Sequence, residues 1–194
     1  DLELVLSPDN SLHEKQSLIG SILSCQHEVL IQQNSIPLFW GKKRLRSFLQ
    51  TPNLPLMAVI QAARKGCRVR VLIDSTWYNI DVRDERKNDK TVAMLNKLAE
   101  QEKLNLRARL INLPATGVAK IHAKGVIVDR KEVFVGSINW TENSFKGNRE
   151  VGVIIRHPKV ASYYADLFIR DWLHSRIFQI VLRGPSPVYK QPSI

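Results

Sequence analysis

Residues 53–74 read NLPLMAVIQAARKGCRVRVLID, and this stretch decides the expected fold. Pro55 is tolerated in the first turn of a helix and Gly66 is a typical C-terminal stop, so we expect a helix over 53–65. The Val-rich alternation that follows predicts a strand over 67–74. A helix that leads directly into such a strand is typical of α/β folds.

The alternation of strands and helices continues in both directions from this stretch. The other expected strands cover 2–6, 29–32, 104–111, 120–129, 132–137 and 150–155, and the other expected helices cover 12–25, 89–103 and 158–174. This order predicts an α/β fold, an α-β-α sandwich around a mixed β-sheet. We expect a single domain over 1–182 and an extended tail rich in Pro and Ser over 183–194.

Charge is the clearest feature of the composition. The 194 residues include 29 Lys and Arg against 18 Asp and Glu, which gives a formal net charge of +11. Such an excess favours a phosphate-rich partner, either nucleic acid or an anionic lipid surface, and the charge alone does not choose between them. A hydrophobic content of 44% excludes a disordered or collagen-like chain.

Several other classes of protein are excluded or left open. No run approaches the roughly 18 consecutive apolar residues of a membrane span, so we expect no transmembrane segment. Cys25 and Cys67 lie far apart outside any CxxC pattern, which excludes a disulfide scaffold and a thiolate zinc site. A chain that begins at Asp1 is expected to be a trimmed piece of a longer product. Its compartment stays open, and would be extracytoplasmic if a signal segment preceded Asp1.

Polar residues gather in the second half of the chain, in HAKGVIVD at 122–129 and GSIN at 136–139. In a strand, side chains at i and i+2 share a face, so His122 and Lys124 are expected to point the same way. A two-residue turn at 130–131 would then place His122 opposite Asn139 and Lys124 opposite Ser137. The four side chains would lie close enough to hold one tetrahedral anion.

These residue types suit the cleavage of a phosphodiester. Lys124 supplies a cation, and Ser137 and Asn139 supply hydrogen-bond donors, which together offset the negative phosphate oxygens. A neutral imidazole at His122 can attack phosphorus and carry a covalent phosphoryl group, so no metal or cofactor is expected. Such a histidine needs an acceptor for its second nitrogen, and Glu150 is the best acidic candidate.

One requirement is unmet, because the leaving oxygen needs a proton from an acid on the far side of phosphorus. A second His-x-Lys occurs at 13–15, but no Asp or Gly-Ser-x-Asn follows it at the required spacing. We therefore expect the acid to come from another copy of His122 across a twofold axis, or from a further lobe.

The motif closely resembles the signature H-x-K-x4-D-x6-G-S-x-N of the phospholipase D superfamily. All six fixed positions match, at His122, Lys124, Asp129, Gly136, Ser137 and Asn139. The resemblance implies an α-β-α sandwich and a metal-independent phosphodiesterase with a phosphohistidine intermediate, built from two facing motif copies. It also implies that the second His122, or its counterpart in a fused lobe, acts as general acid.

The resemblance assigns roles to the motif residues. His122, Lys124, Asp129 and Asn139 form the catalytic set, and Gly136, Ser137 and Glu150 support it. Asp129 lies seven residues from His122, about 23 Å along a straight strand, so we expect it to fix the hairpin turn or pair with a basic group.

The superfamily includes phospholipases, lipid synthases, nucleases and DNA-repair phosphodiesterases, so the motif indicates the reaction and not the substrate. The segment FWGKKRLR at 39–46 combines aromatic and basic residues, which would suit stacked bases and a phosphate backbone. Its candidate substrate-binding residues are Trp40, Lys42, Lys43 and Arg44. The same composition would suit an anchor on anionic lipid, or a solvated basic loop with Trp40 in the core.

Two further features lie after the strand at 67–74. Asp74, at the carboxyl end of that strand, could line the cleft, and Trp77 and Tyr78 could stack on a substrate or cover the sheet edge. We expect a nuclease-type phosphodiesterase that acts as a homodimer. The alternatives are a phospholipase D acting on phosphatidyl lipids and a non-catalytic phosphate-binding half of a two-motif enzyme.

Overall fold

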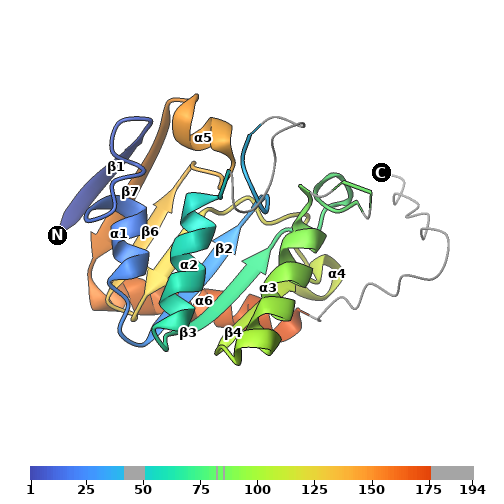
Figure 1. Ribbon diagram of the computed structural model, residues 1–194. Coiled ribbons are helices and arrows are strands. Elements are labelled where there is room, and N and C mark those ends of the chain that lie inside the picture. Colours follow the sequence, from blue (N-terminus) through green and yellow to red (C-terminus); the bar gives the residue numbers. More distant parts are fainter. Residues whose placement is uncertain (42–50, 82, 85, 176–194) are drawn as a thin grey trace.

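A single mixed sheet of seven strands organises the protein, as seen in a computed structural model that describes residues 1–41, 51–81, 83–84 and 86–175. The strands lie in the order β1-β7-β6-β5-β2-β3-β4 (Figure 1). They are β1 (Leu2–Ser7), β2 (Glu28–Gln33), β3 (Arg68–Ile73), β4 (Leu106–Leu110), β5 (Gly125–Val128), β6 (Glu132–Gly136) and β7 (Glu150–Arg156). The strand pairs β2–β3 and β3–β4 are parallel, and all other neighbours are antiparallel.

Helices cover both faces of this sheet (Figure 1). The helices are α1 (Ser17–Leu23), α2 (Leu54–Arg64), α3 (Asn88–Glu102), α4 (Leu113–Thr116), α5 (Glu142–Lys146) and α6 (Pro158–His174), with a 3-10 turn η1 (Trp77–Asn79). Helices α1, α2 and α3 lie on one face, and the long α6 crosses the other. The protein is therefore the expected α-β-α sandwich around a mixed sheet.

The sequence explains why these helices form where they do. In α2 the Asn53 side chain caps the first turn by accepting a hydrogen bond from the Leu56 amide at 3.3 Å. The left-handed φ of +100° at Gly66 ends the segment. In α6 the buried residues fall at helical spacing, so one apolar stripe meets the sheet; they are Ala161, Ala165, Phe168 and Trp172.

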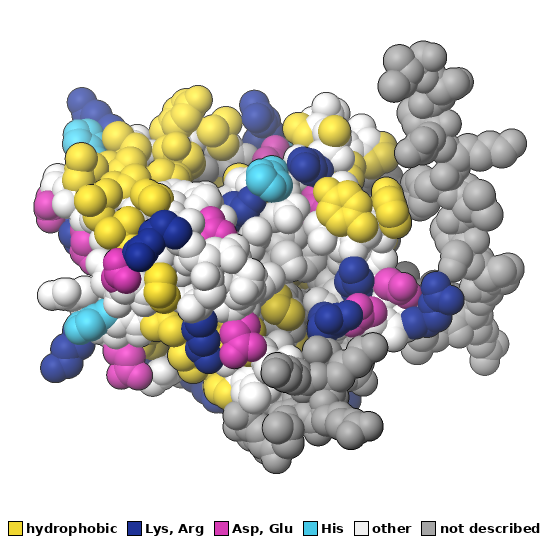
Figure 2. Space-filling view, turned by 90° about the horizontal axis from the view of Figure 1, so that it is seen from above, with side chains coloured by type: hydrophobic (Ala, Val, Ile, Leu, Met, Phe, Trp, Pro, Cys, Tyr) yellow, Lys and Arg dark blue, Asp and Glu magenta, His cyan; other side chains and the backbone are white. Residues whose placement is uncertain are grey.

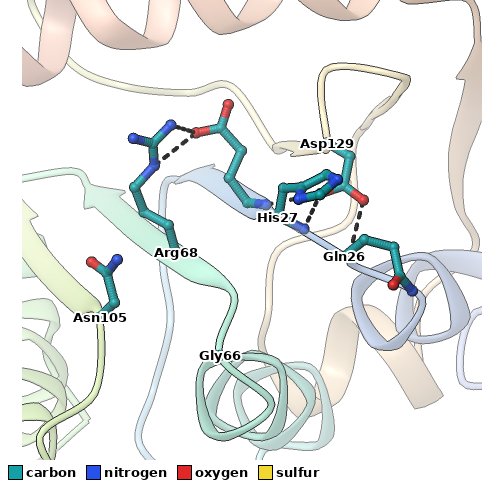
Figure 3. A pocket seen from close by; sticks show the side chains of 7 residues that line it. Gln26, His27, Gly66, Arg68, Asn105 and Asp129 are labelled. Carbon is teal, nitrogen blue, oxygen red and sulfur yellow. Dashed lines mark hydrogen bonds and ion pairs between the residues drawn. The ribbon is translucent and has the colours of Figure 1, made fainter.

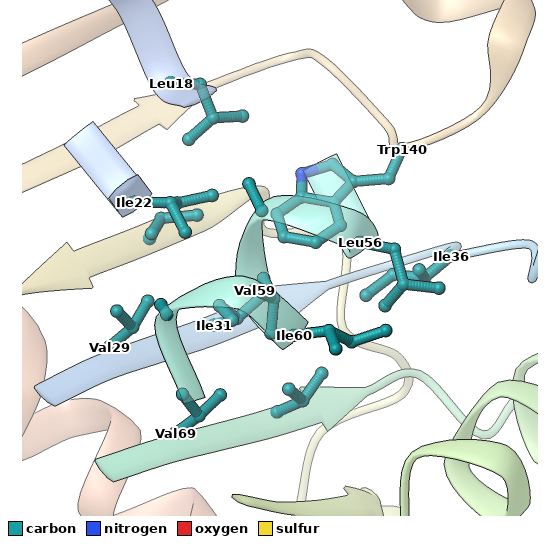
Figure 4. Close-up of a cluster of buried hydrophobic side chains, with 14 of the residues drawn as sticks. Leu18, Ile22, Val29, Ile31, Ile36, Leu56, Val59, Ile60, Val69 and Trp140 are labelled. Atoms are coloured by element: carbon teal, nitrogen blue, oxygen red, sulfur yellow. The ribbon is translucent and has the colours of Figure 1, made fainter. Parts of the chain in front are cut away.

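The larger core lies between the sheet and the α1–α2–α3 layer (Figure 4). Leu56 and Ile60 of α2 lie in this core with Ile31 of β2, and each of the three is at most 1% exposed. Trp140 is fully buried in the same cluster. Because Trp140 directly follows Asn139, its burial ties the end of the catalytic motif to the core.

Most expected elements occur, with shifted ends. The expected helix over 12–25 begins only at Ser17, because residues 8–16 form turns. The expected strand over 120–129 is shortened to β5 at Gly125–Val128. The expected tail over 183–194 lies outside the described residues. Within the described part of the chain, no helix has both the length and the apolarity that crossing a bilayer requires.

Candidate active site

The motif at 122–139 lies at the carboxyl ends of the parallel strands. Strand β5 runs antiparallel to β2, and Gly125 pairs with Gln32 near the end of β2. The residues just before Gly125, which include His122 and Lys124, therefore lie where β2 and β3 finish. This is the end of an α/β sheet at which ligands commonly bind.

The hairpin between β5 and β6 differs from the expected two-residue turn. Val128 pairs with Glu132, so three residues connect the strands, and Asp129 and Arg130 both have a left-handed φ of 52°. This register places Lys124 beside Gly136 instead of Ser137. The expected pairing of His122 with Asn139 within the sheet is also wrong, because β6 ends at Gly136 and His122 lies in a loop before β5.

A pair of side chains holds that loop in place at Ile121. The Ile121 amide donates to Asp74 Oδ1 at 2.7 Å, and the Asn34 side chain donates to the Ile121 carbonyl at 2.7 Å. Asp74 is fully buried and also accepts from the Thr76 amide at 3.0 Å and the Asn79 side chain at 2.8 Å. Both backbone polar groups of Ile121, the residue before His122, are thus fixed by residues that follow β2 and β3.

His122 and Lys124 have contrasting surroundings. The imidazole of His122 is exposed, whereas Lys124 is 4% exposed and its Nζ donates to the His122 carbonyl at 2.7 Å. The charge of Lys124, with smaller effects from burial and Lys120, lowers the pKa of His122 against an opposing effect of Asp74. Burial lowers the pKa of Lys124, and the negative charge of Glu150 partly opposes this shift. The arrangement favours a neutral, accessible imidazole beside a buried cation.

Ser137 and Glu150 bind one another next to this pair. The Ser137 hydroxyl donates to one oxygen of Glu150, and the Asn148 side chain donates to the other at 3.0 Å. Within the described residues the His122 ring makes no hydrogen bond, so the expected bond from His122 to Glu150 is not formed in the single chain. Glu150 instead orients Ser137 and contributes negative charge near Lys124.

Asn139 and Gly136 complete the motif in different ways. The amide oxygen of Asn139 is buried, and it has no hydrogen-bond partner in the described part of the chain. An amide in that state is available for a ligand. Gly136 has a structural role, since a Cβ there would lie 2.5 Å from Gly152 Cα and would push β6 away from β7.

Asp129 lies at the opposite end of β5 from His122. Its carboxylate accepts the backbone amides of Gln26, His27 and Glu28, each at 2.8 Å. Burial alone would raise the pKa of Asp129, but these bonds and the Cys25 thiol hold it below its usual value. Asp129 therefore anchors the turn to residues 26–28 at the end of β5 away from His122, and its place in the catalytic set stays a prediction from the resemblance.

A cavity of about 390 Å3 lies beside Asp129 at this end of the sheet, lined also by Arg68 and Asn105 (Figure 3). It is remote from the His122 loop because β2 and β5 separate the two. Cys25 and Cys67 are both buried near this region as free thiols, and burial raises the pKa of Cys25.

The expected substrate-binding cluster is only partly described. Trp40 is 4% exposed, stacks at a tilt on Phe145 with ring centroids 5.6 Å apart, and donates from Nε1 to the Trp140 carbonyl at 3.1 Å. Trp40 is therefore a core residue, and its assignment to substrate binding is corrected. Lys42, Lys43 and Arg44 lie outside the described residues.

Asn34 and Asn88 are site-supporting residues that the sequence reasoning missed. Asn88 donates from Nδ2 to the carbonyl oxygens of Asn34 and Asp74, both at 2.8 Å, so it joins the ends of β2 and β3. Asn34 could have been found because it is a polar residue directly after a buried strand. That signal was applied only to Asp74. Across the described ranges, no three His, Cys, Asp or Glu side chains gather as a metal site requires.

A family model described as "Cardiolipin synthase, PLD-like domain" matches residues 18–172. The chain belongs to the phospholipase D superfamily. Among curated relatives, a "Phospholipase D" of Rickettsia felis is 31% identical over 119 residues, which is 61% of this chain and 49% of that protein. A "Mitochondrial cardiolipin hydrolase" of Mus musculus is 26% identical over 109 residues, 56% of this chain and 42% of that protein. The chain thus spans about half the length of these relatives.

Solved structures of the phospholipase D superfamily share the fold. NucT from Helicobacter pylori superposes with a TM-score of 0.66 at 21% identity, covering 92% of this chain and 99% of that one. Nuc from Salmonella typhimurium gives the same TM-score and identity over 91% and 96% of the two chains. The fold of the chain is therefore that of the phospholipase D superfamily.

Proposed function

We propose that this chain hydrolyses nucleic-acid phosphodiester bonds without a metal, through a phosphohistidine at His122, as a homodimer. The observation that carries the proposal is the contrast at the motif between the exposed His122 imidazole and the buried Lys124 ammonium. Lys124 lowers the pKa of His122, which keeps the ring neutral and nucleophilic at neutral pH. The unpartnered Asn139 amide can hold a phosphate oxygen.

The reaction divides into two displacements at phosphorus. A neutral ring nitrogen of His122 forms a bond to phosphorus while the bond to the leaving oxygen breaks, and that oxygen takes a proton from an acid on the far side. Water then attacks phosphorus and gives its proton to the same group, which now acts as a base. The phosphorus–nitrogen bond breaks in this step and frees His122. Lys124 and Asn139 stabilise the charge on the phosphate oxygens in both steps.

The far-side acid must be a second imidazole, and an exposed apolar face supports its delivery by a second copy of the chain. Strand pairing places Leu4 of β1 beside Val153 of β7, on the same face of the sheet as α6 but at the edge that α6 does not cover. Leu2, Leu4 and Val151 are 70%, 61% and 52% exposed. Figure 2 shows hydrophobic side chains gathered into such a patch at the upper left of the view.

This apolar β1–β7 face, defined by Leu2, Leu4, Val151 and Val153, continues into the motif. The Ser137 amide donates to the Val151 carbonyl at 2.9 Å, so the face ends directly beside Ser137. Two copies that bury this face against one another would bring their motifs together. An exposed apolar patch of this kind is typical of an interaction site.

Nucleic acid is favoured as the substrate by the charge and by the structural relatives. The net charge of +11 suits a polyanion. The nuclease-type chains Nuc and NucT match this chain over nearly their whole length. Phospholipid cleavage is the second candidate, because curated relatives carry the names phospholipase D and cardiolipin hydrolase.

The test uses the purified chain in EDTA, with a single-stranded oligonucleotide, plasmid DNA and phosphatidylcholine or cardiolipin vesicles as alternative substrates. We expect oligonucleotide cleavage by wild type, loss of cleavage in His122→Ala, and wild-type cleavage in His27→Ala, a control histidine exposed at the other end of the sheet. Reactions quenched in alkaline denaturant should contain a nucleotide bonded through phosphorus to His122, because a phosphorus–nitrogen bond survives alkali and is hydrolysed in acid. Lipid cleavage without nucleic-acid cleavage would overturn the substrate assignment.

The dimer is tested by light scattering of two leucine variants. Leu4→Glu places a charge in the apolar β1–β7 face and should give an inactive monomer, whereas Leu173→Glu, at a leucine 73% exposed on α6, should remain an active dimer. An active wild-type monomer would refute the need for a second imidazole. An inactive wild-type monomer would refute the homodimer and indicate that a further lobe completes the site.

A further inference from the structure

Two aromatic side chains stand exposed after β3, at the same end of the sheet as the motif. Trp77 is 76% exposed and Tyr78 is 41% exposed, and their rings meet edge to face with centroids 5.6 Å apart. Both lie in the 3-10 turn η1. Burial of large aromatic surface is favourable, so two neighbouring exposed rings offer apolar area that a ligand can cover.

The fully buried Asp74 connects this turn to the nucleophile. Its Oδ2 accepts the Thr76 amide at 3.0 Å and the Asn79 side chain at 2.8 Å, on either side of Trp77 and Tyr78. Its Oδ1 accepts the Ile121 amide at 2.7 Å, one residue before His122. One carboxylate therefore fixes the aromatic pair and the catalytic loop relative to each other.

A groove leads from the aromatic turn toward the other end of the motif. This cavity of about 350 Å3 is lined by residues that include Asn79 and Lys87 on one side and Thr141 and Glu142 on the other. Lys87 Nζ also donates to the Tyr78 carbonyl at 2.5 Å. Since Thr141 lies two residues after Asn139, the groove runs between the turn and the residues that hold phosphate.

We propose that Trp77 and Tyr78 form a base-binding platform, which stacks a nucleobase next to the phosphate attacked by His122. This inference rests on the proposed function and names the part of the substrate that the site recognises. Aromatic rings stack on any base, because every base presents a π face, and Lys87 beside the turn supplies positive charge for the backbone. The platform would select single-stranded nucleic acid, whose bases are free to leave a stack.

The neighbours of the aromatic pair favour a base over a lipid. An interfacial anchor needs a broad apolar surface. The residues around Trp77 and Tyr78 are polar or charged instead, with Ser75, Thr76 and Asn79 in the turn and Lys87 beneath it. Figure 2 shows the hydrophobic side chains of this end in separate groups, with basic side chains between them.

The experiment measures binding of two fluorescent oligomers in a His122→Ala background, which prevents cleavage. One is a dodecamer of deoxythymidine, and the other is an abasic dodecamer with the same phosphates. Because stacking of one base contributes about 1–3 kcal/mol, Trp77→Ala should raise the Kd for the thymidine oligomer about 5- to 150-fold and leave the abasic oligomer unchanged. Trp77→Phe should retain most of the affinity.

Tyr163→Ala removes a ring that is 64% exposed on α6 and serves as the matched control, with no expected change. The proposal is overturned if Trp77→Ala leaves both Kd values unchanged, weakens both oligomers equally, or weakens only binding to anionic phosphatidylglycerol vesicles. Base-dependent binding without any cleavage by the wild-type protein would refute the proposed function and leave the platform standing. Melting temperatures of all variants should match that of the parent, since Trp77 is exposed.

Discussion

Replacement of Asp129 tests whether the aspartate of a catalytic motif can serve the fold alone. Its carboxylate accepts three backbone amides at 2.8 Å, from Gln26, His27 and Glu28. A hydrogen bond to a charged group contributes about 1.5–3 kcal/mol, but two of these amides belong to exposed residues and can bind water instead. We therefore expect Asp129→Ala to lower the free energy of unfolding by about 2–4 kcal/mol.

For a chain of this size that loss corresponds to a decrease in Tm of about 5–15 °C. Thermal and urea unfolding followed by circular dichroism would measure it. The effect depends on pH in a defined direction. Because the folded pKa of Asp129 lies below its unfolded value, the carboxylate stabilises the fold above about pH 4, and that contribution is lost as pH falls through the folded pKa. The gap between wild type and Asp129→Ala should therefore close in acid.

Asp166 provides the matched control. It pairs with Arg130 beside the same turn at 2.9 Å, but its side chain is 72% exposed, so Asp166→Ala should cost less than about 1 kcal/mol. Activity of folded Asp129→Asn at 20 °C should remain within a few-fold of wild type. If Asp129→Asn unfolds like wild type and loses activity 100-fold or more, Asp129 takes part in the chemistry and the structural assignment is refuted.

Three further changes have definite expected outcomes. The acidic limb of kcat/KM should lie below about pH 6.5, since the pKa of His122 is lowered, and Lys120→Gln should move that limb to higher pH by removing a positive charge; an unmoved limb would contradict the assignment. Gly136→Ala should lower stability by about 1–3 kcal/mol in urea titrations, because its Cβ meets the Gly152 backbone, and an unchanged midpoint would be inconsistent with the tight approach of β6 to β7. Trp40→Ala should cost about 3–5 kcal/mol of unfolding free energy with an unchanged KM, whereas a raised KM at full stability would restore Trp40 to the substrate surface.

The layered fold could be predicted from the sequence because its signals are local. The Asn53 cap, Pro55 and Gly66 mark the ends of α2 to within a residue, and the apolar stripe of α6 marks Pro158–His174. The start of α1 was missed, because residues 8–16 form turns while Leu12 still fits a helical pattern.

The register of the β5–β6 hairpin could not be predicted, because turn length is decided by a contact far away in sequence. Asp129 reaches the amides of residues 26–28, which holds it in a left-handed conformation and lengthens the connection to three residues. The sequence around 129–132 contains no sign of that partner. The residues of the motif could therefore be picked out from the sequence by their spacing, while the register that arranges them on the strands could not be predicted.

The residues that hold the site in place could not be predicted either, because their contacts also join segments far apart in the sequence. Asn34 and Asp74 follow separate strands, and both bind the backbone of Ile121, which lies far from either in the sequence. Trp40 was wrongly assigned to substrate binding, because the local sequence of an aromatic residue beside a basic run does not show whether its ring is buried or exposed. Its contact with Phe145 lies more than a hundred residues away along the chain.

The pairing of β1 with β7 has a consequence for how the chain is made. Six residue pairs join Leu2–Ser7 to Glu150–Ile155, so among the described strands the first along the sequence bonds to the last. During translation the apolar segment with Leu2 and Leu4 stays unpaired until β7 has left the ribosome. A chaperone that binds short hydrophobic stretches would find its target there, and release would have to coincide with the arrival of β7.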